Sequence, residues 1–282
     1  MKHTSEGSFF TVEERGDVRT VRFTHHQRLA GVELPQAQRL WALFEAQKAR
    51  PSKVLVIEAP TQLLTPENLD AFWAGVLSRQ QPGDAPSPVA ETVMQLLREE
   101  NALCYFIEWV RSLDALVIFV LQGRIDLPFL GLALAGDYRI VADDTVFVSR
   151  CLDVGLPPCG ALPWFLTRYL GQGKASEILL KSRSIPAAEA LELHLVDEVA
   201  PVVDLERRVR ATAERFASKP RVGLVAAKRS MIAAEASLES YLGQERHIFE
   251  QCVNQAEMES GEESPAFLHP ERRGAAQGSS AQ

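Results

Sequence analysis

Two cysteines, Cys151 and Cys159, carry the side chains best suited to nucleophilic chemistry. A thiolate attacks carbonyl carbon well, but the thiol must first lose its proton to a base or lie beside a positive charge. No histidine is near either cysteine in the sequence, although the fold could bring one close. The alternative is that both are small core residues, which is the commoner role of a free cysteine.

Two aspartates, Asp126 and Asp153, could move protons. A carboxylate within reach of a carbon-bound proton can act as a general base or acid. The alternative for Asp126 is a solvated loop position, which is the more common one for aspartate. Asp153 stands in the run DVGL, where an aspartate can instead fix a turn.

Metal chemistry is not predicted. The six histidines form no HExxH pattern, and the cysteines show neither CxxC nor Cys/His ligand spacing. We therefore expect no metal site, no disulfide framework and reduced thiols. The cysteines concerned are Cys104, Cys151, Cys159 and Cys252.

The composition excludes several classes of partner. The chain has 282 residues, 46% of them hydrophobic, and a net charge of -7, which gives no general attraction to nucleic acid or to anionic membranes. The first ten residues contain no apolar stretch typical of a secretory signal, and no apolar run reaches membrane-spanning length. A cytoplasmic location is expected.

Hydrophobic periodicity predicts an α/β core. Two β-prone runs between Phe9 and Thr24 surround Gly16 and predict a hairpin, and a helix is expected from Pro35 to Ala49. Continuous apolar runs at 54–57 and 116–121 are typical of parallel strands that are covered on both faces.

Strand and helix continue to alternate until residue 199. A Pro/Gly/Ser-rich loop is expected at 81–88, followed by a long helix with an apolar face from Val93 to Val110, and by another strand at 138–142. Three helices are then predicted, at 204–218, 222–236 and 238–255. We assign 1–203 to the α/β core, 204–273 to a helical region of the same domain, and 274–282 to a disordered tail.

The segment from Leu121 to Pro201 resembles the crotonase (enoyl-CoA hydratase/isomerase) superfamily. The resemblance rests on the runs LQGRIDLPFLGLALAGDYRIVADDTVFV, DVGLPPCGALPWFLTRYLGQGKASEILL and SIPAAEALELHLVDEVAP. It implies a spiral of β-β-α units with a C-terminal helical trimerisation region, and an acyl thioester as ligand. Within the superfamily, LGLALAGD and CGALPWFL are similar to dehydratases of polyketide β-branching.

The resemblance also implies an oxyanion hole of two backbone N–H groups, the usual means of stabilising a developing enolate. The second donor belongs to the middle of a Gly-Gly-Gly run, where this chain has Leu127, Pro128 and Phe129. Proline has no N–H. The first donor falls at or next to Pro66, although Thr65-Pro66-Glu67 equally suits a helix start.

The acidic residues of the superfamily fall on Gly131 and Cys151, so neither position carries a carboxylate. The polyketide dehydratases also have glycine at the first of these positions, which leaves activity possible. The resemblance implies that Cys151 and Cys159 line the pocket, with Asp126, Phe129 and Asp153 as further candidates. Lys228 is similar to a basic residue near the coenzyme A phosphates, or it belongs to a solvated helix face.

Three hypotheses follow for the function. The first is a diverged hydratase-like protein that binds acyl-CoA or an acyl-carrier-protein thioester with weak or no conventional activity. The second is an active dehydratase, hydratase or isomerase with a rearranged site, and the third is a structural partner of a catalytic paralogue. In each case we expect a homotrimer, a hexamer or an assembly mixed with a paralogue. We expect no resident cofactor, because coenzyme A or phosphopantetheine enters only as the substrate carrier.

Overall fold

The computed structural model describes residues 2–3, 10–23, 34–59, 88–149, 151–152, 155–234 and 238–258. Pro66, Asp153 and the tail from 274 lie outside these ranges, as does the loop expected at 81–88 except for Pro88, which is the first residue of a helix. None of the helices within them is long and apolar enough to span a bilayer.

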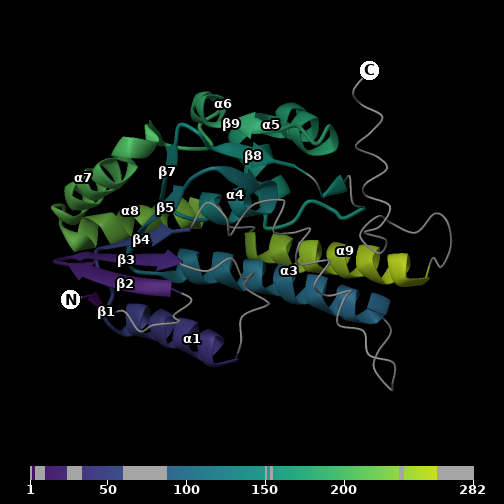
Figure 1. Ribbon diagram of the computed structural model, residues 1–282, viewed down its shortest axis with the longest axis horizontal. Coiled ribbons are helices and arrows are strands. Elements are labelled where there is room, and N and C mark those ends of the chain that lie inside the picture. The colour runs from purple at the N-terminus through teal and green to yellow at the C-terminus, as the bar shows by residue number, and fades with distance from the viewer. Residues whose placement is uncertain are drawn as a thin grey trace.

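A seven-stranded sheet, ordered β1-β2-β3-β4-β5-β7-β10, forms the centre of the molecule (Figure 1). The predicted hairpin is confirmed, because β2 and β3 pair antiparallel around Gly16, whose φ of 57° suits a tight turn. From β3 onward the neighbours are parallel. The strands are β1 (Lys2–His3), β2 (Phe10–Arg15), β3 (Val18–Phe23), β4 (Val54–Glu58), β5 (Leu116–Leu121), β7 (Tyr138–Ala142) and β10 (Glu198–Ala200).

The central strands are covered on both faces, as their continuous apolar runs predicted. Val56 and Ile118 belong to a small cluster completed by Val209 and Ala213 of α7 (Leu205–Ala217). Residues of opposite parity, such as Leu55 and Phe119, belong to the main core, with residues of α3 (Pro88–Ser112) and α4 (Leu127–Leu134).

A second, three-stranded sheet was not predicted from the sequence. Its strands, β6 (Arg124–Asp126), β8 (Val146–Val148) and β9 (Ile185–Pro186), are too short to give a periodic signal. Strand β6 leads directly into α4, so this sheet positions the start of that helix. The remaining helices are α1 (Leu34–Ala49), α5 (Leu162–Leu180), α6 (Ala187–Glu192), η3 (Val202–Asp204), α8 (Arg221–Ala234) and α9 (Leu238–Met258).

Helices α3 and α9 lie side by side, although they come from distant parts of the chain (Figure 1). The three predicted C-terminal helices are confirmed as α7, α8 and α9, with bounds that differ by at most three residues. Buried Leu242 and Phe249 of α9 belong to the same core as Leu103 and Ile107 of α3. Helix α9 therefore closes the core and is not an appendage.

Lys228 of α8 is buried and links α8 to other parts of the core, so it is not a surface cation. The residue is 4% exposed, and its ammonium group donates to the carbonyls of Val110 and Ala115, at 3.1 and 3.0 Å, and to Asp137 Oδ2 at 2.8 Å. All three N–H donors are therefore used. This contradicts both the expected phosphate contact and the solvated-face alternative.

Replacing Lys228 with Met should lower the free energy of unfolding by about 3 kcal/mol, because the buried Asp137 carboxylate loses its counter-charge. Urea unfolding measures this effect. Arg229→Met is the matched control: the Arg229–Asp114 pair is exposed, and its loss should cost less than about 1 kcal/mol. Equal losses in the two variants would contradict the role assigned to Lys228.

Candidate active site

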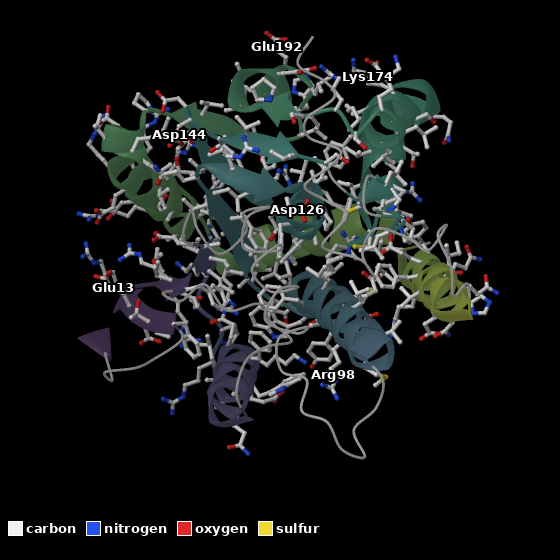
Figure 2. The ribbon with its side chains drawn as sticks, turned by 45° about the vertical axis from the view of Figure 1, so that its right-hand side comes forward. Glu13, Arg98, Asp126, Asp144, Lys174 and Glu192 are labelled. Carbon is white, nitrogen blue, oxygen red and sulfur yellow. The ribbon has the colours of Figure 1, made fainter. Side chains whose placement is uncertain are left out.

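The start of α4 is built around Asp126, the last residue of β6. Asp126 is 4% exposed and occupies the N-cap position of α4, where its Oδ1 accepts a hydrogen bond from the N–H of Leu127 at 3.1 Å. Figure 2 places it well inside the molecule, whereas Asp144 and Glu192 lie at the periphery. The solvated-loop alternative is therefore wrong, and Asp126 has a structural task in the site.

Pro128 lies in the first turn of α4 and is buried. A proline is well tolerated there because the first N–H groups of a helix have no partner within it. It nevertheless supplies no donor at a place where a helix would otherwise present one. Phe129, the next residue, is partly buried and packs against the main core.

Gly131 allows α4 to meet the segment before α5 at very short range. A Cβ atom at this position would lie 2.0 Å from the carbonyl oxygen of Gly160 and 3.1 Å from the backbone nitrogen of Leu162. In turn, a Cβ at Gly160, whose φ is +71°, would lie 2.6 Å from the carbonyl oxygen of Pro128. The backbone at 160 thus rests on the first turns of α4 and excludes any side chain at 131.

The two candidate cysteines come together beside this contact. Cys159 is buried and hydrogen-bonds with the half-buried Cys151. That hydrogen bond, with burial and the negative charge of Glu100, holds the pKa of Cys159 well above its ordinary value. A protonated thiol is a poor nucleophile, so Cys159 does not provide an activated thiolate.

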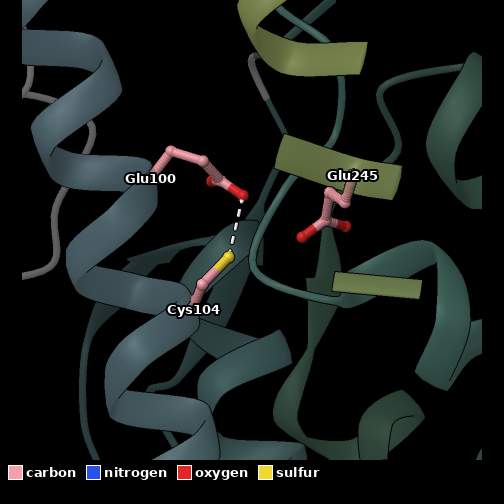
Figure 3. A group of neighbouring side chains, drawn as sticks. All are labelled: Glu100, Cys104 and Glu245. Carbon is pink, nitrogen blue, oxygen red and sulfur yellow. Dashed lines mark hydrogen bonds between the residues drawn. The ribbon is translucent and has the colours of Figure 1, made fainter. Parts of the chain in front are cut away.

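Two buried carboxyl groups, Glu100 of α3 and Glu245 of α9, face the same place (Figure 3). Cys104 Sγ donates to Glu100 Oε1 at 3.2 Å. The Glu245 oxygens accept from the N–H of Ala161 at 2.8 Å and from the hydroxyl of Tyr241 at 2.8 Å. Glu245 is therefore fixed to the residue that follows Gly160.

Burial and mutual repulsion change the titration of this pair. Burial, then the charge of Glu100, raises the pKa of Glu245 to about 8, and burial also raises the pKa of Glu100. Two carboxylates so close cannot both be charged at neutral pH, so the pair holds one proton. Glu245 accepts two hydrogen bonds, whereas Glu100 Oε2 is buried and has no hydrogen-bond partner.

Ligand atoms of Glu100, Cys104 and Glu245 all lie within 4.8 Å of one another, a composition that a divalent cation could use. Burial raises the pKa of the Cys104 thiol as well. A cation would therefore have to displace protons from both the thiol and the carboxyl pair. The hydrogen bonds of Glu100, Cys104 and Glu245 therefore fit a cluster that holds protons better than one that holds a metal ion.

The sequence profile of the enoyl-CoA hydratase/isomerase family matches residues 105–273, more than half of the chain and all of the α4–α5 region. The chain belongs to this family. A "Probable enoyl-CoA hydratase" of Rhodobacter capsulatus is 33% identical over 160 residues, which cover 53% of this chain and 62% of the relative. One from Mycobacterium avium is 41% identical over 99 residues, or 35% of this chain and 38% of the relative.

In these two alignments the chain spans between about two fifths and three fifths of the relative's length. Its fold is similar over a greater length. An enoyl-CoA hydratase structure from Mycobacterium avium subsp. paratuberculosis K-10 superposes with a TM-score of 0.67 and 20% identity, covering 96% of both chains. One from Thermoplasma volcanium gives 0.62 and 20%, covering 89% of this chain and 94% of the other. The crotonase fold expected from the sequence is confirmed.

Sequence reasoning missed the carboxyl pair of this family member, although a signal was present. Glu100 is four residues from Leu96 and from Cys104, on the buried stripe of α3. Glu245 lies between Leu242 and Phe249 on the buried stripe of α9. A glutamate at a core position of an amphipathic helix predicts a partner, but only the tertiary structure shows that the partner is another glutamate.

Replacing Gly131 with Ala in the hydratase-family protein should cost about 2 kcal/mol or more of unfolding free energy, because the added Cβ overlaps the Gly160 carbonyl. Thermal and urea unfolding measure the change. Gly173→Ala in α5 is the control, since nothing lies within 4 Å of its added Cβ and helix propensity favours alanine by up to about 1 kcal/mol. If both variants gain stability, the close approach at 131 is not present.

The stability of the protein should fall as pH rises from about 5 to about 8. In the unfolded chain Glu245 has the ordinary glutamate pKa of 4.5, whereas folding raises this pKa to about 8, so the proton stabilises the fold less at each higher pH. The slope is at most about 1.4 kcal/mol per pH unit for one proton.

Urea unfolding at several pH values measures this slope in the wild type and in Glu245→Gln, which should be less dependent on pH in this range. Glu108→Gln, on the exposed face of α3, should keep the wild-type slope. Parallel curves for Glu245→Gln and the wild type would show that Glu245 titrates normally.

Proposed function

We propose that the protein binds an acyl thioester, carried on coenzyme A or on an acyl-carrier protein, and has weak or no conventional hydratase activity. Family membership supports the ligand class, although fold alone never establishes a reaction. The runs LGLALAGD and CGALPWFL resemble polyketide dehydratases, which act on carrier-protein thioesters, so the proposal includes both carriers.

The contact between Gly160 and Gly131 carries the second half of the proposal. If Gly131 occupies the acid/base position of the family, a carboxylate cannot be placed there without moving the backbone at 160. If Pro128 occupies the second oxyanion position, that donor is missing, and the loss of one donor typically lowers turnover by about 100- to 1,000-fold. The two features together argue against hydration by the usual residues.

The active alternative, a dehydratase, hydratase or isomerase with a rearranged site, is favoured by one observation. Glu100 and Glu245 lie beside Cys159 and Ala161, close to the region where the family places its acidic residues. Assembly as a homotrimer, a hexamer or a mixed complex with a paralogue, and a cytoplasmic location, stay predictions.

Titration of the purified protein with acetyl-, crotonyl- and longer acyl-CoA by calorimetry should give saturable binding with little change in double-bond absorbance. Rapid loss of crotonyl-CoA absorbance would overturn the proposed lack of conventional hydratase activity. The same titrations with acylated carrier protein identify the carrier, and absence of binding to either thioester would overturn the proposed ligand class.

A further inference from the structure

The buried carboxyl pair occupies the part of the molecule from which the family residues have been lost. Glu245 is hydrogen-bonded to Ala161, and the adjacent Gly160 rests on Pro128 and on Gly131. Glu100 hydrogen-bonds with Cys159, which in turn hydrogen-bonds with Cys151. Three elements that converge at the start of α4 therefore connect the pair to positions 128, 131 and 151.

The pair is also linked to the outside through one of these positions. Cys159 and Glu100 are buried, whereas Cys151 is half-buried, so the hydrogen-bonded line from Glu100 through Cys159 ends at a partly accessible thiol. Position 151 is where the resemblance puts the second acidic residue of the family. The pair is thus separated by one buried thiol from the place where the relatives would use a carboxylate.

Burying a carboxyl group from each of two helices, α3 and α9, is an energetically unfavourable way to hold those helices together. Hydrophobic residues of similar size would pack α3 against α9 at least as well, because burying a carboxyl group carries a desolvation penalty. Groups with strongly perturbed titration and a specific charged partner are candidates for proton chemistry. Tyr241, Cys104 and the N–H of Ala161 then orient the pair by hydrogen bonds.

We propose that Glu100 and Glu245 form the acid–base unit of this protein, in place of the carboxylates missing at positions 131 and 151. The inference rests on the thioester binding proposed above. In the step concerned, the carbon–hydrogen bond next to the thioester carbonyl breaks and its electrons move to the carbonyl oxygen as an enolate. The proton passes to the carboxylate of the pair, and the reverse step returns a proton to the same carbon.

Within the described part of the chain, the charged and titratable groups around the pair come from three elements, and none of these groups is a histidine. Arg246 of α9 pairs with Glu108 of α3 at 3.3 Å, toward the surface. The others are Glu100 and Cys104 of α3, Tyr241 and Glu245 of α9, and Cys151 and Cys159 of the segment before α5.

The first test needs no ligand. Infrared difference spectra between the wild type and Glu100→Gln at pH 7 should show the carbonyl stretch of a protonated carboxyl group in the wild type alone. In the variant, Glu245 keeps its donors from Ala161 and Tyr241, loses its negative neighbour and ionises. Absence of that band from the wild type would overturn the proposal.

The second test measures the step itself. The protein is incubated with butyryl-CoA in deuterated water, and incorporation of deuterium next to the carbonyl is followed by mass spectrometry. Glu100→Gln and Glu245→Gln should each slow the exchange by at least about 100-fold, within the usual range for a general base. Calorimetric affinity for butyryl-CoA should change little, and Glu108→Gln should exchange at the wild-type rate.

The outcomes separate the two proposals. Binding without wild-type exchange, or exchange that both glutamine variants retain, would overturn the acid–base role and leave the proposed thioester binding intact. Absence of binding to butyryl-CoA and to its carrier-protein counterpart would overturn the proposed function and the acid–base role with it. Circular dichroism of each variant shows whether a slow rate reflects unfolding.

Discussion

The contact of the Gly160 carbonyl with α4 determines the rest of the site. Because no Cβ fits at 131, the helix and the segment before α5 meet backbone to backbone, and close packing leaves neither free to shift alone. The same contact fixes the direction of the next N–H group, that of Ala161, whose φ is +56°. That N–H then points at Glu245 of α9, so the position of a C-terminal side chain depends on a glycine in the core.

Buried charge in this molecule is handled in two different ways. Lys228 and Asp137 neutralise one another, and the remaining ammonium donors are used by backbone carbonyls, so the pair is a satisfied tie. Among the residues that the structure describes, no cation donates to Glu100 or Glu245, and the proton has to serve instead. The first arrangement is an ion pair, whereas the second holds a proton whose pKa is raised into the neutral range.

Most of the fold could be predicted from the sequence, because its signals are local. The hairpin at Gly16, the apolar strands and the three C-terminal helices all follow from periodicity and turn residues. The small sheet of β6, β8 and β9 could not be predicted, since two or three residues show no period. The site was harder still: the solvated alternative for Asp126 and the phosphate role of Lys228 were wrong, because burial of a polar side chain depends on partners distant in the sequence.

The hydrogen bond between Ala161 and Glu245 joins residues that are 84 positions apart, and it sets an order of events during synthesis. A nascent chain that has just exposed residue 161 holds an amide whose partner has not yet been translated. Glu100 is then in the same state, since its neighbour also belongs to α9. Until α9 has been synthesised, the N–H of Ala161 and the carboxyl group of Glu100 therefore have to be hydrated, and the interior beside α4 can close only once that helix is available.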